Sequence, residues 1–468
     1  MAGLYEELLA LSENGRIPFH MPGHARRDDF EGLGSAARID FTEIDGLDNL
    51  HAPEGILREA MERAAKVWGA DRAFFLVGGS TVGMLAAVRA LCKGGRPLLL
   101  ARNAHRSAYH AALLARAPLF TLPAPLHPLG FALDVSPEAV RRALDEHPGI
   151  RAVAVTSPTY DGIVSDIASI AAVCHERGIP LLVDAAHGAH LGFLDPGLPS
   201  PVSCGADVTV MSLHKTLPAL TGTALLCVRG SLADPEEIAA ALQIFETSSP
   251  SYPLMASADS CAGRMGDAGL FAHWRDVVGR IRQNAGDLLL RPRTAGGDGE
   301  GPAVFGFDES KLLLRCPPMT GGELAAFLRS RNIEPEMIAP DYVLLMTTAG
   351  TTDEHASALI RALAELPRPD SGSDGPAFRV PAPGEKVTEM WTAAEGESLS
   401  VPLEDAVGRT SAEFLVPYPP GIPLLVPGER IGGELPEALR RLSESGCAVH
   451  VSRGLFSGSL RVVKEAGG

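Results

Sequence analysis

The chain has 468 residues, of which 46% are hydrophobic and 21% charged, as in globular proteins of two or three domains. Its formal net charge is −16, which argues against a nucleic-acid partner because that binding needs a basic surface. No apolar run approaches the roughly 20 residues that cross a bilayer. The acidic stretch MAGLYEELLALSENG predicts an amphipathic helix at the N-terminus and no signal peptide.

The seven cysteines are scattered, and none is spaced as CxxC. An odd, scattered set argues against a disulfide framework and against a zinc site. We therefore expect reduced thiols in a cytoplasmic protein that has no membrane span.

From about residue 70 to residue 230, short apolar strands alternate with helices. The predicted strands are 72–77, 98–102, 151–158, 181–184, 208–212 and 223–228. The predicted helices are 81–92, one that begins after Ser136 as its N-cap, and 166–177. This alternation predicts an α/β fold with a mostly parallel sheet covered on both faces, in which ligands bind beyond the carboxyl ends of the strands.

A second, smaller αβ unit is predicted between about 303 and 365. Its predicted elements are the strands 312–315 and 342–347 and the helices 323–332 and 353–366. Two stretches rich in Gly and charge or in Pro and Ser, 291–302 and 367–386, predict linkers. The tail contains a Pro-rich, strand-poor stretch at 416–431 and a predicted helix at 435–445. We therefore expect an N-terminal arm and a large domain over 1–270, a small α/β domain over 271–366, a linker over 367–386 and a C-terminal domain over 387–468.

Lys215 follows the predicted strand 208–212 in the stretch SLHKT. A lysine at a strand end can be desolvated, which lowers its pKa and makes the amine a nucleophile that can hold a carbonyl cofactor as an imine. Taken alone, SLHKT is a weak motif, and a surface lysine in a loop explains it better.

Two further groups follow strands, and together with Lys215 they favour a cofactor site over a surface lysine. Asp184 ends the strand 181–184, where a buried carboxylate needs a cationic partner such as a protonated pyridine nitrogen; the alternative is a cap for a following helix. The stretch 78–81, with Ser80 and Thr81, can bind phosphate at a helix N-terminus; the alternative is a glycine turn with a Ser or Thr cap. A phosphate cradle, an Asp and a Lys in this order predict pyridoxal 5′-phosphate (PLP), whereas no GxGxxG or GxxxxGK[ST] near the first strands supports a nucleotide.

Three histidines also follow predicted strands. His105 comes after 98–102, where its ring can stack on a flat cofactor or simply start a surface helix. His187 and His190, with Asp184 nearby, resemble a set of metal ligands. Their segment leaves a strand instead of lying along a helix as HExxH does, so we expect no metal.

The chain resembles the Orn/Lys/Arg decarboxylase family of fold-type-I PLP enzymes. The blocks that carry the resemblance run nearly end to end: FHMPGH (19–24), GLDNLHAPEG (46–55), FFLVGGST (74–81), RNAHRS (102–107), TSPTYDG (156–162), VDAAHGAH (183–190), SLHKTLPALTG (212–222), TSSPSYPLMASAD (247–259) and VPYPPGIPLLVPGE (416–429). The resemblance implies a large domain like that of aspartate aminotransferase, a small αβ domain and a small C-terminal domain. The chain length implies the short form of the family, without the extra N-terminal domain of larger relatives.

The resemblance also implies roles for individual residues. Lys215 matches the Schiff-base lysine, Asp184 the partner of the pyridine nitrogen and His105 the histidine stacked on the ring, while His214 is a candidate proton donor beside Lys215. The implied cofactor-binding residues are Ser80, Thr81, His105, Asp184, Ala186, His187, Ser212, His214, Lys215, Thr247 and Ser248. Thr247 and Ser248 lie in the segment that reaches the phosphate of the partner subunit, which implies an obligate homodimer with sites at its interface and leaves a higher assembly open.

The implied reaction is the decarboxylation of arginine, lysine or ornithine to the corresponding polyamine-pathway amine and CO₂. Two alternatives remain: another fold-type-I reaction (an aminotransferase or a lyase), and a non-catalytic PLP-binding homologue. The blocks HAPEG, HGAH and YPPGIP favour the decarboxylase over the first, and the intact Lys215 and Asp184 argue against the second.

The sequence defines the residues that bind the substrate less well than those that bind the cofactor. The distal cation of a basic substrate needs a carboxylate. The candidates are Glu43, Asp45, Asp48 and Glu413, and for each one a surface acid or a helix cap is the more common role. The chain departs from the usual family blocks at Ala25, Arg106, Ala185 and Gly222. No departure removes an essential group, but Ala25 and Ala185 bear on substrate preference or on support of the site.

Overall fold

The computed structural model describes residues 3–13, 34–294, 299–367 and 378–464. The block at 19–24 and Ala25 lie outside the described residues. The predicted N-terminal helix is present as α1 (Leu4–Glu13), and it is anchored where the backbone N–H of Leu4 donates to the Asp259 carboxylate over 2.8 Å.

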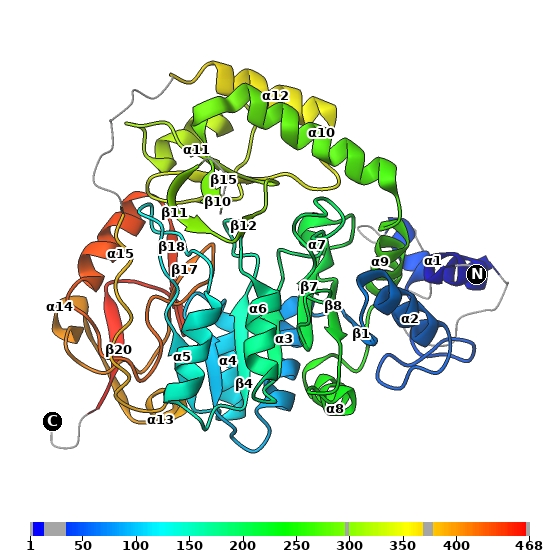
Figure 1. The fold of residues 1–468 in the computed structure, drawn as a ribbon, viewed down its shortest axis with the longest axis horizontal. Coiled ribbons are helices and arrows are strands. Elements are labelled where there is room, and N and C mark those ends of the chain that lie inside the picture. The colour runs from blue at the N-terminus through cyan, green and yellow to red at the C-terminus, as the bar shows by residue number, and fades with distance from the viewer. Residues whose placement is uncertain (1–2, 14–33, 295–298, 368–377, 465–468) are drawn as a thin grey trace.

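The centre of the molecule is a seven-stranded sheet in the order β1-β8-β7-β6-β4-β2-β3 (Figure 1). Its strands are β1 (Arg72–Leu76), β2 (Leu98–Ala101), β3 (Leu119–Leu122), β4 (Ala152–Thr156), β6 (Leu181–Asp184), β7 (Val208–Ser212) and β8 (Ala224–Val228). Only β8 runs antiparallel to its neighbours in this sheet, so the predicted mostly parallel sheet is confirmed. Nearly every strand residue is buried, as a sheet covered on both faces requires.

Helices cover both faces of this sheet. Alternate strand residues point to opposite faces, and the buried clusters separate accordingly: Ala152 and Ala154 of β4 share one cluster, whereas Val153 and Val155 share the other. The first face packs against α3 (Gly79–Leu91), α4 (Arg106–Ala115) and α8 (Pro235–Phe245). The second packs against α2 (Ile56–Trp68), α5 (Pro137–Glu146), α6 (Ile167–His175) and α9 (Tyr252–Arg264).

A second sheet of four antiparallel strands lies above the first in Figure 1. Its order is β14 (Met337–Ile338), β15 (Val343–Met346), β13 (Lys311–Leu314) and β9 (Leu289–Leu290). The helices of this part are α10 (Ala268–Ala285), α11 (Gly321–Arg329) and α12 (Asp353–Ala364). The expected boundary at residue 270 falls inside α10.

The predicted linker at 291–302 is wrong in part, because β10 (Pro292–Thr294) pairs there with β11 (Glu300–Val304). Glycine and charge made this stretch resemble a loop, but strand pairing uses backbone N–H and C=O groups and does not depend on an apolar side chain. The next strand, β12 (Gly306–Phe307), pairs with β5 (Ile163–Val164), which follows β4 of the large sheet. This short two-stranded sheet therefore links the chain segments that follow β4 and precede β13.

The C-terminal part lies beside the large sheet, at the left in Figure 1. It contains α13 (Met390–Glu395), α14 (Leu403–Ala406), α15 (Leu435–Glu444), the pair β16 (Ser398–Pro402) and β20 (Ser459–Val463), and the sheet β17 (Leu415–Tyr418), β18 (Ala448–Val451) and β19 (Gly454–Leu455). Phe414 and Val416 belong to the same buried cluster as α3 and α4. The nearly buried pair Arg102–Glu429, at 3.4 Å, adds a charged contact between the two parts.

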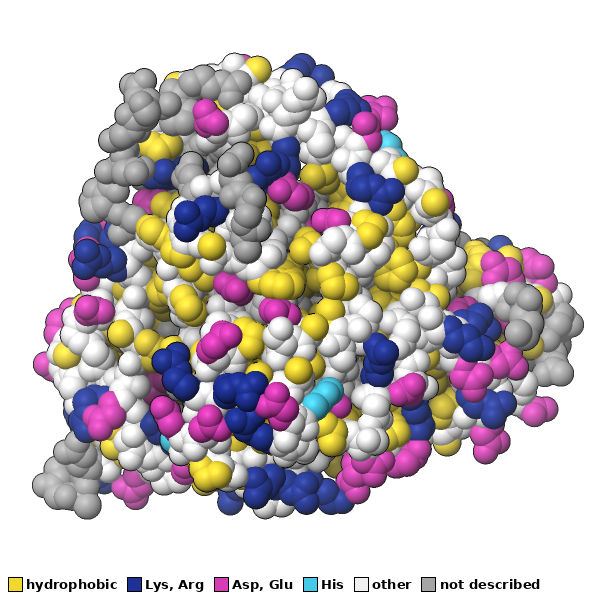
Figure 2. Space-filling model, viewed as in Figure 1, with side chains coloured by type: hydrophobic (Ala, Val, Ile, Leu, Met, Phe, Trp, Pro, Cys, Tyr) yellow, Lys and Arg dark blue, Asp and Glu magenta, His cyan; other side chains and the backbone are white. Residues whose placement is uncertain are grey.

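The visible face in Figure 2 carries Lys and Arg side chains interspersed with Asp and Glu, while hydrophobic side chains gather in the middle. No extended basic surface appears on this face. None of the described helices combines the length and the apolarity needed to cross a bilayer.

Candidate active site

The large sheet brings three predicted groups to one edge. β1, β6 and β7 run in the same direction, since β8 is antiparallel to both β1 and β7 and β6 is parallel to β7. Their carboxyl ends lead into the glycine turn before α3, into Asp184, and into α7 (Leu213–Thr216) with His214 and Lys215. The three groups therefore meet at the edge where ligands bind in such sheets.

Lys215 is partly buried, and its Nζ lies 3.1 Å from Nε2 of His187. Burial lowers the pKa of the Lys215 amine, while the charges of Asp184 and Glu336 act in the opposite direction. An amine whose pKa is lowered has a larger unprotonated fraction near neutral pH and is a better nucleophile.

Asp184 is only 4% exposed, and its Oδ1 accepts a hydrogen bond from the backbone N–H of Ala186 over 3.1 Å. Burial raises the pKa of its carboxyl, partly offset by the charge of Lys215 and by that N–H. The residue starts no helix, and no ion pair to it is present among the described residues. A buried carboxylate of this kind is costly unless a ligand supplies the cation, and the pyridine nitrogen of PLP fits that need.

The predicted phosphate cradle is the N-terminus of α3. The helix begins at Gly79, its N-cap is Gly78, and no side chain caps it, so the alternative of a Ser or Thr cap is wrong. Ser80 and Thr81 occupy the second and third helical positions, where backbone N–H groups have no partner within the helix. Ser212, which is fully buried, also has a hydroxyl without a partner among the described residues. These free donors fit a phosphate.

His105 is the N-cap of α4, and its Nδ1 accepts from the backbone N–H of Ser107 over 3.2 Å. Burial, followed by the positive charges of Lys215 and Arg106, lowers the pKa of His105 to about 3. The ring is therefore neutral. Gly421 of the C-terminal part adopts φ +86, and a Cβ at this position would come within 2.7 Å of the His105 ring, so the C-terminal loop lies directly against it.

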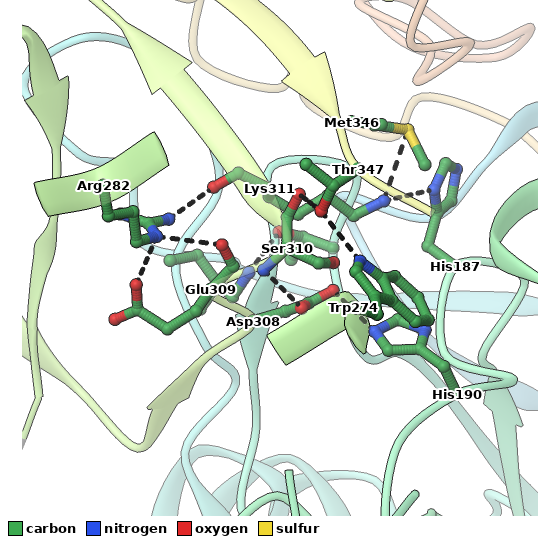
Figure 3. A network of polar contacts seen from close by, with 12 residues as sticks. His187, His190, Trp274, Arg282, Asp308, Glu309, Ser310, Lys311, Met346 and Thr347 are labelled. Carbon is green, nitrogen blue, oxygen red and sulfur yellow. Dashed lines mark hydrogen bonds and ion pairs between the residues drawn. The ribbon is translucent and has the colours of Figure 1, made fainter. Parts of the chain in front are cut away.

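His187 and His190 point to different partners (Figure 3). His187 is 6% exposed, and its Nδ1 lies 3.1 Å from Nζ of Lys311. His190 Nε2 instead bonds to the Asp308 carboxylate over 3.1 Å. In the part of the chain that the structure describes, no group of three His, Cys, Asp or Glu side chains could hold a metal.

The four carboxylates considered for the substrate's distal cation differ in their surroundings. Asp48 accepts backbone hydrogen bonds from Glu54 and Gly55 at 2.8 and 2.7 Å, just before α2. Glu413 is buried and accepts from the backbone N–H of Arg461. Two of the four are therefore engaged by their own backbone, and the other two, Glu43 and Asp45, are exposed.

Three side chains of the site were not predicted: Tyr160, Lys311 and Glu336. The Tyr160 ring lies 4.6 Å from that of His187, and its hydroxyl donates to the exposed Glu336 carboxylate. Burial lowers the pKa of both Lys215 and Lys311, and the charge of Glu336 opposes part of that shift in each. One feature of the sequence could have indicated Lys311, since it is a lysine directly before an apolar strand. No pattern in the sequence around Glu336 indicates a functional residue.

Thr247 and Ser248 are exposed in the single chain. The Thr247 carbonyl lies 2.9 Å from Nε2 of His51, so the segment is held to the loop before α2. Their contact with a partner subunit stays a prediction.

Comparison with known proteins covers nearly the whole chain. The family described as Orn/Lys/Arg decarboxylase, major domain, matches residues 2–288, and the one described as Orn/Lys/Arg decarboxylase, C-terminal domain, matches residues 379–446. The chain is 32% identical to the arginine decarboxylase of Bacillus anthracis, over 99% of this chain and 97% of that protein. It is also 32% identical to the arginine decarboxylase of Bacillus subtilis, over 99% and 98%. The lysine decarboxylase of Francisella novicida has a similar fold, with a TM-score of 0.83 at 20% identity over 98% of this chain and 81% of that one.

Proposed function

The chain belongs to the Orn/Lys/Arg decarboxylase family, and we propose that its substrate is arginine. It is a PLP-dependent decarboxylase that removes CO₂ from a basic amino acid. The observation that carries the choice of arginine is the 32% identity, over almost the full length of both chains, to arginine decarboxylases of two Bacillus species.

The cofactor roles that we propose follow the geometry of the strand ends. Lys215 holds the cofactor covalently, Asp184 keeps a proton on its pyridine nitrogen, and the neutral ring of His105 stacks on it. The N-terminus of α3 with Ser80 and Thr81, together with Ser212, binds the phosphate. Ala186 and His187 line the same site, and the hydrogen bond from Ala186 supports the orientation of the Asp184 carboxylate.

PLP supplies an electron sink for the electrons that remain on Cα when CO₂ leaves. The protein must then deliver one proton to Cα in place of the carboxylate. Lys215 and His214 are the proposed donors. His214 Nδ1 lies 2.8 Å from the carbonyl of Thr223, which places a hydrogen on Nδ1, so His214 can donate from Nε2 only when it is doubly protonated.

For the distal cation we add Glu336 to Glu43, Asp45, Asp48 and Glu413. A guanidinium needs a carboxylate with free oxygens. The Glu336 carboxylate is exposed, forms no ion pair among the described residues, and is held beside His187 by Tyr160. Asp48 and Glu413 are weaker candidates, because their carboxylate oxygens already accept hydrogen bonds from the backbone.

We infer further that the protein acts as a homodimer with its sites at the interface, and that it is cytoplasmic. The exposed Thr247 and Ser248 support the dimer because, in the single chain, they are free to reach a second subunit. The seven free cysteines support a reducing compartment. The division into 1–270, 271–366, 367–386 and 387–468 is likewise a proposal, with α10 spanning its first boundary.

Incubation of the PLP-loaded protein with arginine, lysine or ornithine tests the proposal, with CO₂ and the amine measured separately. We expect amine and CO₂ in equal amounts and a kcat/KM for arginine at least about tenfold above the other two, because a missing contact to a buried or partly buried charge is worth 1 to 3 kcal/mol. Preference for lysine or ornithine would overturn the substrate. Keto acid in place of amine would indicate an aminotransferase, and no turnover of any of the three would indicate a non-catalytic homologue.

A further inference from the structure

Lys311 opens β13 of the four-stranded sheet and is fully buried. Its Nζ lies 3.1 Å from Nδ1 of His187 and 3.3 Å from Sδ of Met346 (Figure 3). No ion pair to it is present among the described residues. A buried ammonium without a carboxylate partner is energetically costly.

The acidic groups whose charges act on Lys311 each have another hydrogen-bond partner. Asp308 bonds to His190 Nε2 and to the backbone N–H of Ser310 at 3.1 and 3.0 Å. Asp161 accepts from the Tyr342 hydroxyl over 2.6 Å, and Glu336 accepts from Tyr160. Burial lowers the pKa of Lys311 to about 8, although the charges of Asp308, Glu336 and Asp161 act in the opposite direction. Nδ1 of His187 therefore remains as the nitrogen acceptor for its ammonium.

His187 lies between two amines, Lys311 at Nδ1 and Lys215 at Nε2, each at 3.1 Å. Burial, followed by the charge of Lys311, keeps the pKa of the imidazole well below its usual value, so the ring is neutral. A neutral imidazole has one N–H and one lone pair, whereas an ammonium only donates. If Lys311 donates to Nδ1, the ring hydrogen sits on Nε2 and points at Lys215, which must then accept with the lone pair of its amine.

We propose that Lys311 is a positioning residue that acts through His187 to keep the Lys215 amine unprotonated, in the form that can bond to a carbonyl carbon. The hydrogen bonds run in one direction, from Lys311 to His187 to Lys215. The inference rests on the proposed role of Lys215 as the lysine that holds the cofactor.

The test measures the pKa of Lys215 in cofactor-free protein by competitive labelling with a trace of acetic anhydride over a pH series, read by mass spectrometry of the peptide that contains it. In Lys311→Met, the Lys215 pKa should rise by about 1 unit, which is about tenfold less free amine at neutral pH. Lys311→Arg, which keeps a cation and a donor, should retain the lower pKa. Lys93→Met removes an exposed lysine paired with Glu237 and should leave the Lys215 pKa unchanged.

An unchanged or lower Lys215 pKa in Lys311→Met would overturn the proposal, and so would an equal rise in Lys311→Met and Lys311→Arg, because that result would indicate packing instead of charge. A double-mutant cycle adds an independent measurement. In a His187→Gln background, Lys311→Met should shift the Lys215 pKa by less than half as much as in the native protein, and an equal shift would exclude the path through His187.

These outcomes separate this inference from the proposed function. If the native protein never forms the PLP absorbance band that sodium borohydride removes, the assignment of Lys215 fails. If the band forms at the native rate in Lys311→Met and the Lys215 pKa does not move, only the role of Lys311 fails. Near-ultraviolet circular dichroism of each variant shows whether it is folded.

Discussion

The two sides of the active site are built in different ways. On the side of the large sheet, Asp184 is the last residue of β6, and Lys215 lies three residues beyond the end of β7, so the backbone of a buried sheet positions them. On the opposite side, Lys311 opens β13 of the four-stranded sheet and Glu336 immediately precedes β14, and both reach the site with long side chains. The first arrangement suits groups that must hold a cofactor in one place, and the second suits groups that adjust protonation and meet the substrate.

The two sides also carry opposite buried charges. Asp184 on one side and Lys311 on the other are both almost inaccessible, and neither has an ion pair among the described residues. Each charge alone destabilises the fold. The charge of Lys215 offsets part of the cost at Asp184, and a protonated pyridine nitrogen would offset more of it.

The largest expected effect lies on the strand-end side. Lys215→Ala removes the amine that bonds to the cofactor, so kcat should fall by about 10⁴-fold or more, since groups that act as covalent catalysts contribute on this scale. The borohydride-reducible absorbance band should disappear while the circular dichroism spectrum is kept. Lys93→Ala is the matched control on the surface, and near-native turnover by Lys215→Ala would contradict the assignment.

Asp184→Asn should separate catalysis from stability. The amide cannot keep the pyridine nitrogen protonated, so kcat should fall by about 10² to 10³-fold, the range found when one preorganised electrostatic group is removed. The cofactor-free variant should nevertheless unfold at a higher temperature than the native protein, because the raised pKa of Asp184 means that its charged form destabilises the fold at neutral pH. A variant that loses both activity and stability would show that Asp184 already has a cationic partner within the protein.

The difference between the two sides also explains what could be predicted from the sequence. The glycine turn, Asp184 and Lys215 each follow a buried apolar run, and in a parallel sheet the ends of such runs must meet. Lys311 opens a strand of the second sheet and Glu336 lies just before another, and their approach to His187 depends on how the two sheets pack, which no local pattern encodes. Asp48 illustrates the converse, because only the folded chain brings its carboxylate to the start of α2, where it accepts hydrogen bonds from the backbone N–H groups of Gly55 and Leu57.

The contact of the C-terminal part with His105 can be broken at Gly421. This glycine has a positive φ, and an added Cβ would collide with the imidazole ring. Gly421→Val should therefore displace His105 and weaken cofactor binding by about tenfold or more, in addition to the 1 to 2 kcal/mol that the left-handed backbone costs a side chain. Gly432→Ala, where a Cβ meets nothing within 4 Å, should bind the cofactor normally. Native affinity in Gly421→Val, measured by fluorescence titration, would show that the C-terminal loop is not needed to position the ring.

A substitution at Glu336 tests the side of the site that we expect to meet the substrate. Glu336→Gln keeps the hydrogen bond with Tyr160 possible but removes the negative charge, so the KM for arginine should rise about tenfold with little change in kcat, the pattern expected when uniform binding is lost. Glu334→Gln, two residues earlier and paired on the surface with Arg329, is the matched control. If kcat falls and KM does not change, Glu336 acts on the reacting centre and another carboxylate binds the guanidinium.

The smallest effect concerns the pH dependence of stability. The folded-state pKa of Lys311 is about 8, below that of a lysine in an unfolded chain, so the unfolded state binds more protons between about pH 8 and pH 10.5. The cost of the buried ammonium is thus fully present below pH 8 and is relieved as the pH rises. Cofactor-free Lys311→Met should unfold about 2 to 4 °C above the native protein at pH 7, and the gap should narrow by pH 9.5. Lys93→Met should unfold at the same temperature as the native protein at both pH values. If the increase in unfolding temperature of Lys311→Met is independent of pH, packing accounts for it and the buried charge does not.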